Sequence, residues 1–332
     1  MRSLPALPTR SIFTCTLAVI GMALLAGCAL GPAPAPTPDM GALATQLWVE
    51  ISVKNTLEAS MATATPQPTA TPAPTPTPLW ISTPLPIPAS AALPLSANNP
   101  ITGVAVVYVP AGEFLMGSAE TDSNRDPASE EPQHKVYLDA FWISKLQVTN
   151  AMFNACVAAG SCNYSAGHAT NPNYLDPLFA NHPVVYVSWD MAQTYCRWTG
   201  GRLPTEAEWE KAARGPDGQR YPWGTDMARI KYANANNEVG NTTAVGTFPF
   251  GTSYYGALDM GGNVREWVSD WYDADYFSVS PVANPQGPES GDAKVLKGAS
   301  YKDPWVYSRS ANRLSHEPAS PGAVRGFRCV YP

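Results

Sequence analysis

Charged residues are scarce in the first third of this 332-residue chain. Residues 1–100 contain only six charged side chains but 17 of the 34 prolines, a composition that buries too little apolar surface to fold as a globular domain. Residues 101–332 hold 18 Lys and Arg against 24 Asp and Glu, a net charge of −6. Because no basic excess is available to neutralise phosphates, we exclude nucleic-acid binding. This second part is long enough to bury a sizeable core.

Long apolar runs are also absent, except near the N-terminus. Residues 12–25 follow Arg2 and Arg10 and are apolar, but they are too short to span a bilayer comfortably and end in small residues, as a secretory signal does. The sequence LAGC at 25–28 resembles the lipobox of bacterial lipoproteins, which implies that Cys28 becomes the lipidated first residue of the mature chain. The alternative is a signal peptide, or a transmembrane anchor, that happens to carry a cysteine. We expect export and a lipid anchor on the outer face of a bacterial membrane.

A tether follows the predicted signal peptide at residues 1–28. Residues 29–100 are rich in Pro, Thr and Ala, and their Thr-Pro repeats favour an extended polyproline conformation, which reaches ~200 Å at most at about 3.1 Å per residue. We expect this segment to be mostly disordered and residues 101–332 to form the folded domain.

Cysteines are few, and four of the six lie in the folded part: Cys156, Cys162, Cys196 and Cys329. An even number fits an oxidising compartment. Of the three possible pairings we favour Cys156 with Cys162, which bracket a short turn at a helix end, and Cys196 with Cys329, which would close a long loop for a chain-entropy gain of ~4 to 5 kcal/mol. Thiolate metal ligation is the competing interpretation, although the chain contains no CxxC or Cys/His cluster.

Local patterns predict a mixture of strands and helices. Two stretches are rich in apolar and β-branched residues, as strands are: 104–115 and 135–148. Three segments follow a helix-capping residue: 150–159 behind Thr149, 189–199 behind Ser188 and 206–214 behind Thr205. Thr205 and Glu208 also form a capping box. Beyond Gly215 the chain is rich in Gly, Asn, Pro and aromatic residues, so we expect an α+β fold with long loops.

Eight sequence blocks identify a family resemblance. In chain order they are VPAGEFLMG (109–117), EPQHKV (131–136), VTN (148–150), HPVVYVSW (182–189), GRLPTEAEWE (201–210), YPWG (221–224), GNVREW (262–267) and GFRC (326–329). Together they resemble the formylglycine-generating enzyme family, also called the sulfatase-modifying factor family, over essentially all of 104–332. The resemblance implies a C-type-lectin-like α+β fold with little regular secondary structure. It also implies the Cys196 to Cys329 bridge.

The enzymes of this family oxidise a sulfatase cysteine to formylglycine with O2 and a copper ion, which two cysteines of the C-terminal block hold. Here that block reads KGASYKDPWVYSRSANR (297–313) and contains no cysteine. By the family pattern, the first copper-binding position falls on Asp303 and the second near Tyr307 or Ser308. A carboxylate and a hydroxyl cannot replace the soft thiolates that Cu(I) selects. We therefore expect no copper and no oxidase activity of the family type.

The chain also contains few histidines that could bind a metal ion. Other branches of the family use iron and a histidine triad, but this chain has four histidines and no HxxxH pair: His134, His168, His182 and His316. An iron site is therefore not expected. Acid/base pairs can be drawn among Asp303, His316 and Glu317, and we interpret these as solvated loop residues.

Two loops resemble the calcium sites of the family. The first would use the side chains of Asp259 and Glu266 with the carbonyls of Gly262 and Val264. The second would use Asn234 and the Ala235 carbonyl, with Asn237 and Val239 if a gap is placed between them. Hard Ca2+ prefers such carboxylate and carbonyl oxygens. The alternative is that hydrogen bonds alone hold these loops.

Two functional hypotheses follow from these observations. In the first, the domain is a binding or recognition module for a peptide, glycan or partner protein. In the second, it is an enzyme, either a formylglycine-generating-type oxidoreductase or one with other chemistry in the same groove. The predicted groove residues are Ser300, Asp303, Trp305, Tyr307, Arg309, Arg313 and His316. The missing thiolates favour the recognition module.

Overall fold

The computed structural model describes residues 95–332, apart from 165–170 and 227–228. The predicted signal peptide, its Cys28 and nearly all of the predicted tether lie outside the described residues. Within the described part, no helix is both long and apolar enough to cross a membrane.

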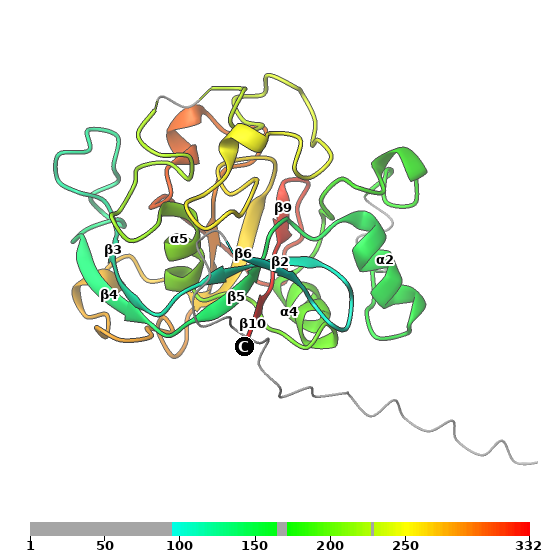
Figure 1. Cartoon of the computed structure of the whole chain (residues 1–332), viewed down its shortest axis with the longest axis horizontal. Coiled ribbons are helices and arrows are strands. Elements are labelled where there is room, and N and C mark those ends of the chain that lie inside the picture. The colour runs from blue at the N-terminus through cyan, green and yellow to red at the C-terminus, as the bar shows by residue number, and fades with distance from the viewer. Residues whose placement is uncertain (1–94, 165–170, 227–228) are drawn as a thin grey trace, which may run out of the picture. The chain divides into compact units, whose positions relative to one another are not determined.

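Three sheets form the framework of the domain (Figure 1). The first is antiparallel, in the order β1 (Ser96–Asn98), β2 (Ala105–Val109), β5 (Phe141–Ser144) and β10 (Val330–Tyr331). The second pairs β3 (Gly112–Met116) with β4 (His134–Leu138). The third has the order β8 (Arg313–His316), β7 (Lys294–Lys297), β6 (Arg265–Trp271) and β9 (Arg325–Phe327), in which only β6 and β9 are parallel. Both predicted strand stretches are confirmed, and each divides into two strands.

The three predicted helices are confirmed with their caps: α2 (Asn150–Ala158), α4 (Trp189–Trp198) and α5 (Glu206–Arg214). The hydroxyls of Thr149, Ser188 and Thr205 each accept a hydrogen bond from a first-turn amide. The capping box of α5 is complete, because Glu208 also accepts from the Thr205 amide. In the described part of the chain, four short 3-10 helices lie in the loops: η1 (Pro177–Phe179), η2 (Pro249–Gly251), η3 (Tyr276–Ser278) and η4 (Trp305–Ser308).

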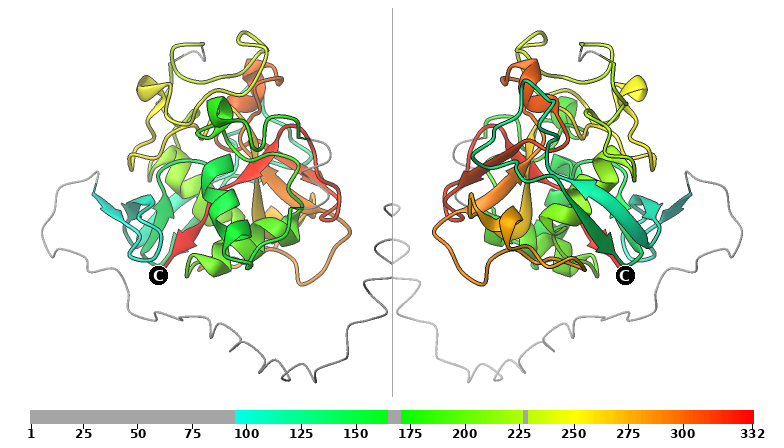
Figure 2. Two further views of the ribbon diagram at one scale, coloured as in Figure 1. Left: turned by 90° about the vertical axis from the view of Figure 1, so that its right-hand side faces the viewer. Right: turned by 90° about the vertical axis from the view of Figure 1, so that its left-hand side faces the viewer.

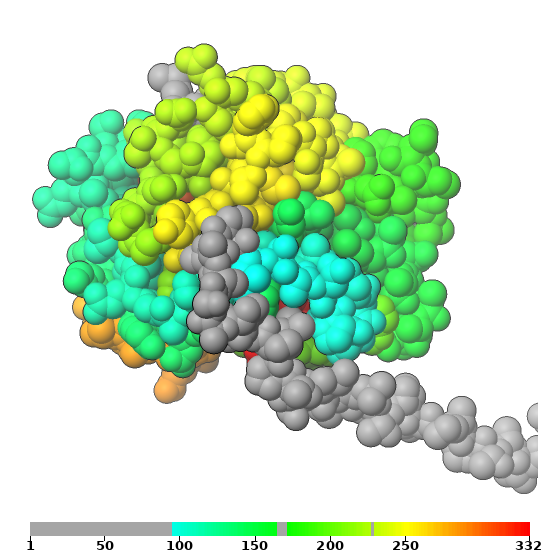
Figure 3. Space-filling model, viewed as in Figure 1, coloured from blue at the N-terminus to red at the C-terminus, as the bar shows by residue number. Residues whose placement is uncertain are grey.

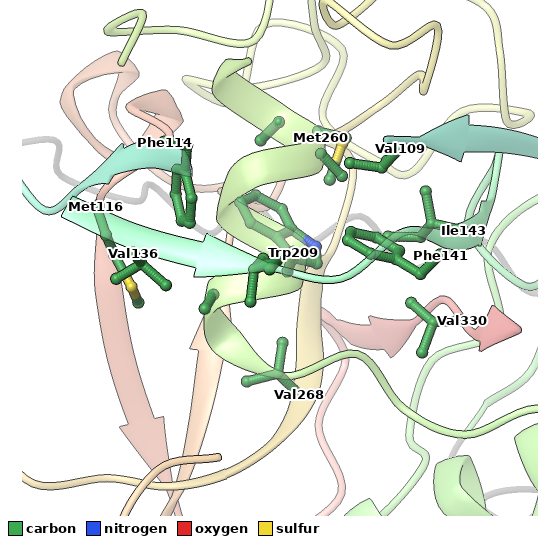
Figure 4. Close-up of a cluster of buried hydrophobic side chains, with 14 of the residues drawn as sticks. Val109, Phe114, Met116, Val136, Phe141, Ile143, Trp209, Met260, Val268 and Val330 are labelled. Atoms are coloured by element: carbon green, nitrogen blue, oxygen red, sulfur yellow. The ribbon is translucent and has the colours of Figure 1, made fainter. Parts of the chain in front are cut away.

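Helix α5 is the centre of the first hydrophobic core. It lies between the β3–β4 pair and β6 (Figure 1). Its Trp209 is fully buried, and Figure 4 shows the indole among apolar side chains from several strands, including Phe114 of β3, Phe141 of β5 and Val268 of β6. Truncating a tryptophan in such a position costs about 3–5 kcal/mol. This core fixes the start of β6, where the predicted calcium loop ends.

A second core lies around α2 and α4, which pack against each other (Figure 2). Phe153 of α2 stacks on Tyr195 of α4, with ring centroids 5.6 Å apart, and both rings meet Phe327 of β9 edge-on. Both predicted disulfides are confirmed in this region: Cys156–Cys162 and Cys196–Cys329. The second joins α4 to the C-terminal strands across 133 residues.

The folded part begins earlier than we expected from composition. Strand β1 pairs with β2 through Ser96, Ala97 and Asn98, although the predicted tether extends to residue 100. A three-residue edge strand between prolines carries too little apolar pattern to stand out from a Pro-rich segment. The domain therefore includes residues that we had assigned to the tether.

Long loops make up much of the remainder. Between α5 and β6, the described residues form turns and the short helix η2, and they cover one continuous part of the surface (Figure 3, yellow-green to yellow). The predicted α+β architecture with long loops is confirmed. Most of the predicted calcium residues lie on these loops, and Glu266 lies on β6. The predicted ligand residues lie on η4, on β8 and in the loops beside η4.

Candidate functional site

Four oxygen atoms of the loop before β6 surround one side-chain amide. The carbonyls of Asp259, Gly262 and Val264 lie 3.3, 3.2 and 3.1 Å from Nε2 of Gln147. Oε1 of Glu266 lies 3.0 Å from the same nitrogen. The loop can converge in this way because Asp259 adopts the left-handed region, with φ at 62°. Four predicted calcium-site residues thus present oxygen atoms to one point.

Glu266 is held in place from two other elements. Its Oε2 accepts hydrogen bonds from the Trp209 indole of α5, at 2.8 Å, and from Nε of Arg328, at 2.6 Å. A second guanidinium nitrogen of Arg328 donates to Oε1 at 2.8 Å. The side chains of Glu266 and Arg328 are both fully buried. Because a buried ion pair loses several kcal/mol when one partner is removed, the position of this carboxylate is strongly specified.

The donor set fits a hard cation. An amide nitrogen carries two hydrogens and cannot donate fully to all four oxygens, although three of them also accept from other donors: Glu266 Oε1 from Arg328, and the Asp259 and Gly262 carbonyls from loop amides. Oε1 of Gln147 is buried without a partner among the described residues. A half-turn of this amide would bring Oε1 to the position of the nitrogen. Neighbouring oxygens around a Ca2+ bound at about 2.3–2.6 Å lie roughly 3–3.6 Å apart, and the four oxygens lie 3.0 to 3.3 Å from the position that the Gln147 oxygen would take. Gln147 would then complete a set of five oxygens.

The Asp259 side chain differs from the expectation. We predicted its carboxylate as a ligand, but Oδ2 accepts a hydrogen bond from the Gly246 amide at 2.6 Å, and the Asp259 carbonyl faces the cluster instead. Burial raises the pKa of this carboxyl to about 6. The left-handed backbone places the carbonyl and the side chain in different directions, so sequence spacing alone could not distinguish them.

The second predicted calcium loop is only partly assembled. Oδ1 of Asn234 is buried without a partner among the described residues, and Nδ2 donates to the Asn241 carbonyl at 2.8 Å. The Ala235 carbonyl accepts the Glu238 amide at 3.3 Å, and Val239 is exposed. Asn237 donates its backbone amide to the Tyr301 carbonyl at 2.6 Å. One orphaned oxygen, that of Asn234, fits a cation here.

Clusters of carboxylate or thiolate side chains are not what would hold a metal ion in these two loops. Across the described ranges there is no group of three His, Cys, Asp or Glu side chains suited to a metal ion. Both candidate sites therefore depend mainly on carbonyl and amide oxygens, which suit Ca2+ and not a soft metal.

Asp303, which we expected at the first copper-binding position of the family pattern, lies in a polar network. Its Oδ2 accepts from the amide and the hydroxyl of Ser300, at 2.7 and 2.6 Å, and pairs with Nε of Arg265 at 3.0 Å. Arg265 also donates to the Gly298 carbonyl and lies 5.2 Å from the centroid of the Tyr307 ring. Oδ2 of this carboxylate thus has three donors.

Two predicted groove residues, Trp305 and Tyr307, reach the surface on η4. Both are partly exposed, and the Trp305 indole donates to Oε1 of Glu238 at 3.0 Å. This bond connects η4 to the loop of the second candidate calcium site, which also meets the Tyr301 and Asp303 carbonyls through backbone bonds. The two loops together form an aromatic and polar surface, which we call the η4 surface.

Arg309 and Arg313 do not belong to that surface. Both side chains are buried, and each forms a two-pronged ion pair, Arg309 with Glu130 and Arg313 with Glu206. Arg309 also borders a cavity of about 250 Å³, but its guanidinium nitrogens are already engaged. Our expectation that these arginines contact a ligand is therefore not supported. His316 ends β8, where it pairs in register with Lys294, three positions beyond Arg313.

Sequence reasoning missed the buried charges of α5. Every residue of this helix is buried, including Glu206 and Glu210, and Lys297 of β7 lies 2.9 Å from Glu210 and 3.5 Å from Glu206. The spacing of the two glutamates by four residues places them on one helix face. That spacing is the available signal, but the same pattern is usual on exposed faces.

Known proteins resemble this chain in sequence and in fold. Residues 92–332 match the family described as "Sulfatase-modifying factor enzyme 1-like domain". The chain belongs to this family. A formylglycine-generating enzyme of Streptomyces coelicolor is 35% identical over 279 residues, which cover 68% of this chain and 88% of that protein. The structure of PvdO from Pseudomonas aeruginosa matches with a TM-score of 0.61 and 29% identity, over 73% of this chain and 99% of that one.

The sulfatase-modifying factor domain also occurs within a larger protein. The serine/threonine-protein kinase pkn1 of Chlamydia caviae is 35% identical over 241 residues, but the match covers only 37% of that protein. The predicted fold, an α+β and C-type-lectin-like fold of this family with little regular secondary structure, is confirmed. Relatives with such different names show that membership of the family does not by itself specify the activity.

Proposed function

We propose that this sulfatase-modifying factor domain is a recognition module, which binds a peptide, glycan or partner protein without oxidising it. The observation that carries the proposal is the state of Asp303. The position at which the family pattern predicts a copper-binding thiolate carries a carboxylate, and the Ser300 and Arg265 donors already engage its Oδ2. A hard carboxylate oxygen does not replace the soft thiolate that Cu(I) selects.

The cysteines of the domain support the same proposal. All four within the described residues are in disulfides, so none supplies a thiolate. The disulfides indicate an extracytoplasmic domain. Together with the resemblance of residues 25–28 to a lipobox, they support a chain exported and anchored by lipid on Cys28 to the outer face of a bacterial membrane, with the Pro-rich segment as tether.

Ligand contact is proposed at the η4 surface. Trp305 and Tyr307 are partly exposed aromatic side chains, and aromatic residues contribute large contact areas at recognition surfaces. Ca2+ is proposed at the loop that contains Asp259 and Glu266, where it would have a structural role. By binding carbonyl oxygens there and near Asn234, it would hold the loops beside the η4 surface in one arrangement.

An enzyme remains the second candidate, because the formylglycine-generating enzyme of Streptomyces coelicolor is 35% identical to this chain. Such an enzyme would need either a copper site that this block cannot form or other chemistry in the same groove. Among the described groove residues, Asp303 is paired and Arg309 and Arg313 are engaged in buried ion pairs.

A titration with Cu(I) tests the proposal. The full chain in detergent, not reduced, is titrated under anaerobic conditions in competition with a colorimetric Cu(I) chelator. We expect the chelator to retain the copper. The same protein after unfolding and reduction exposes its thiols and is the positive control. Capture of one Cu(I) per native chain, against the chelator, would contradict the proposal.

A further inference from the structure

A small cavity of about 160 Å³ lies beside the loop that carries Tyr301. Asn150, the first residue of α2, lines it, as do His182, Tyr186 and Tyr301. The described residues that line the cavity include several asparagines and aromatic residues and no Asp, Glu, Lys or Arg. The cavity is therefore polar but uncharged, and neither the calcium loops nor the Asp303 network accounts for it.

Asn150, one of the residues that line this cavity, carries an unused hydrogen-bond acceptor. The residue is only 3% exposed. Its Nδ2 donates to the Phe179 carbonyl at 2.9 Å, which fixes the orientation of the amide. Oδ1 is buried and has no partner among the described residues. Because leaving a buried acceptor unpaired costs free energy, this oxygen suits a ligand that donates a hydrogen bond.

Tyr186 is held in a strained backbone conformation at the same cavity. Its φ is 57°, in the left-handed region that side chains other than glycine, asparagine and aspartate rarely adopt. Its backbone amide donates to the Gly322 carbonyl at 2.9 Å, which keeps this segment in place. Such strain persists where the surrounding structure enforces it, and it concentrates at ligand-binding positions.

His182 does not bring a charge to the cavity. Its Nδ1 lies 2.9 Å from the Thr242 hydroxyl, and burial lowers the pKa of the imidazole, with a smaller opposing effect of its hydrogen bond to Thr242. The ring is therefore neutral at neutral pH. A charged ligand would lose its hydration without gaining a counter-charge, which is unfavourable in a cavity of this kind.

We propose that this cavity binds a neutral saccharide unit. A sugar hydroxyl can donate to Oδ1 of Asn150, and the apolar face of a pyranose ring can pack on Tyr186 or Tyr301. An apolar peptide side chain would leave the Asn150 oxygen unpaired, and a phosphate or carboxylate would find no cation. The inference rests on the recognition function proposed above and specifies its ligand class. The site is separate from Trp305.

Saturation-transfer NMR of the full chain in detergent tests this site, with methyl glycosides of neutral hexoses and N-acetylhexosamines at millimolar concentration as probes. We expect at least one probe to bind the wild-type protein. Tyr186→Gly should weaken that binding by about tenfold or more, which is ~1.4 kcal/mol or more. The melting temperature of the Tyr186→Gly variant should fall only slightly, because glycine adopts the left-handed backbone without strain.

Controls separate this inference from the recognition function itself. Tyr254→Ala removes an exposed tyrosine elsewhere and should leave saccharide binding unchanged. Absence of binding by every probe, or binding that Tyr186→Gly leaves intact, would overturn the saccharide site. If Trp305→Ala abolishes binding and Tyr186→Gly does not, the cavity assignment fails while the recognition function stands. Tyr186-dependent binding of an uncharged peptide in place of the sugars would show that the ligand class is wrong.

Discussion

Replacing Gln147 by glutamate distinguishes a calcium site from a loop held by hydrogen bonds alone. The change keeps the shape of the side chain but replaces the amide nitrogen, which faces four oxygens at 3.0 to 3.3 Å, by an oxygen. Without a cation, the new carboxylate would face three carbonyls and the Glu266 carboxylate. With Ca2+ between them, the same oxygen becomes a charged ligand.

The expected effect is large in the absence of calcium. An uncompensated buried charge costs about 3–5 kcal/mol. A domain of this size loses about 2–4 °C in melting temperature per kcal/mol, so the melting temperature should fall by roughly 6–20 °C in chelator. Ca2+ at a hundredfold excess over its Kd raises the free energy of unfolding by ~2.7 kcal/mol. Chelation should also lower the melting temperature of the wild-type chain, but by less.

Thermal melts with calcium and with chelator measure this difference. The matched control is Gln133→Glu, because the Gln133 amide donates to a single carbonyl, that of Gly117, at 3.1 Å. We expect the gap between the two conditions to widen in Gln147→Glu and to stay as in the wild type in the control. Equal destabilisation of Gln147→Glu with and without calcium would refute the site. Glu266→Ala is a weaker test, since it also leaves Arg328 buried and unpaired.

Three further predictions concern the anchor, a buried acid and a buried ion pair. Cys28→Ala should move the chain from the membrane fraction to the soluble fraction, and retention would indicate a transmembrane anchor. Burial, with the nearby Glu206 carboxylate, raises the pKa of Asp270 from 3.8 to about 7. The folded state therefore holds this proton more tightly than the unfolded state does. As a result, the free energy of unfolding should fall as pH rises from about 4 to about 7. Asp270→Asn should remove that contribution in denaturant titrations, and an unchanged pH slope would count against it. Arg313→Met leaves Glu206 with only Lys297 as a counter-charge and should lower the free energy of unfolding by about 3–5 kcal/mol, whereas Arg202→Met, at a half-exposed pair with Glu208, should cost about 1 kcal/mol or less.

Local signals were sufficient to predict the helices and the disulfides. The hydroxyls of Thr149, Ser188 and Thr205 cap α2, α4 and α5 as expected, because a cap involves residues only three positions apart. The strand β1 could not be predicted in this way, since its three residues gain their place only by pairing with β2. Elements that depend on a distant partner carry little local pattern.

The site was predictable in part, through residues that are close in sequence. Gly262, Val264 and Glu266 do converge, but their common partner Gln147 lies 112 to 119 residues from its acceptors in sequence. Similarly, Arg309 and Arg313 have the composition of surface residues, and only the fold shows that Glu130 and Glu206 pair with them inside the domain. Long-range pairing of buried charges has no short-range signature.

The most direct test of the recognition function is an assay for formylglycine formation. The full chain in detergent is incubated with a Cys-x-Pro-x-Arg peptide of the sulfatase type, O2, a reductant and copper, and mass spectrometry follows the peptide cysteine. Because we expect a copper-binding thiolate where this chain has Asp303, and because the four cysteines of the described domain are in disulfides, we predict that the peptide is recovered unchanged. Copper-dependent conversion of its cysteine to formylglycine, with more than one turnover per chain, would contradict the account.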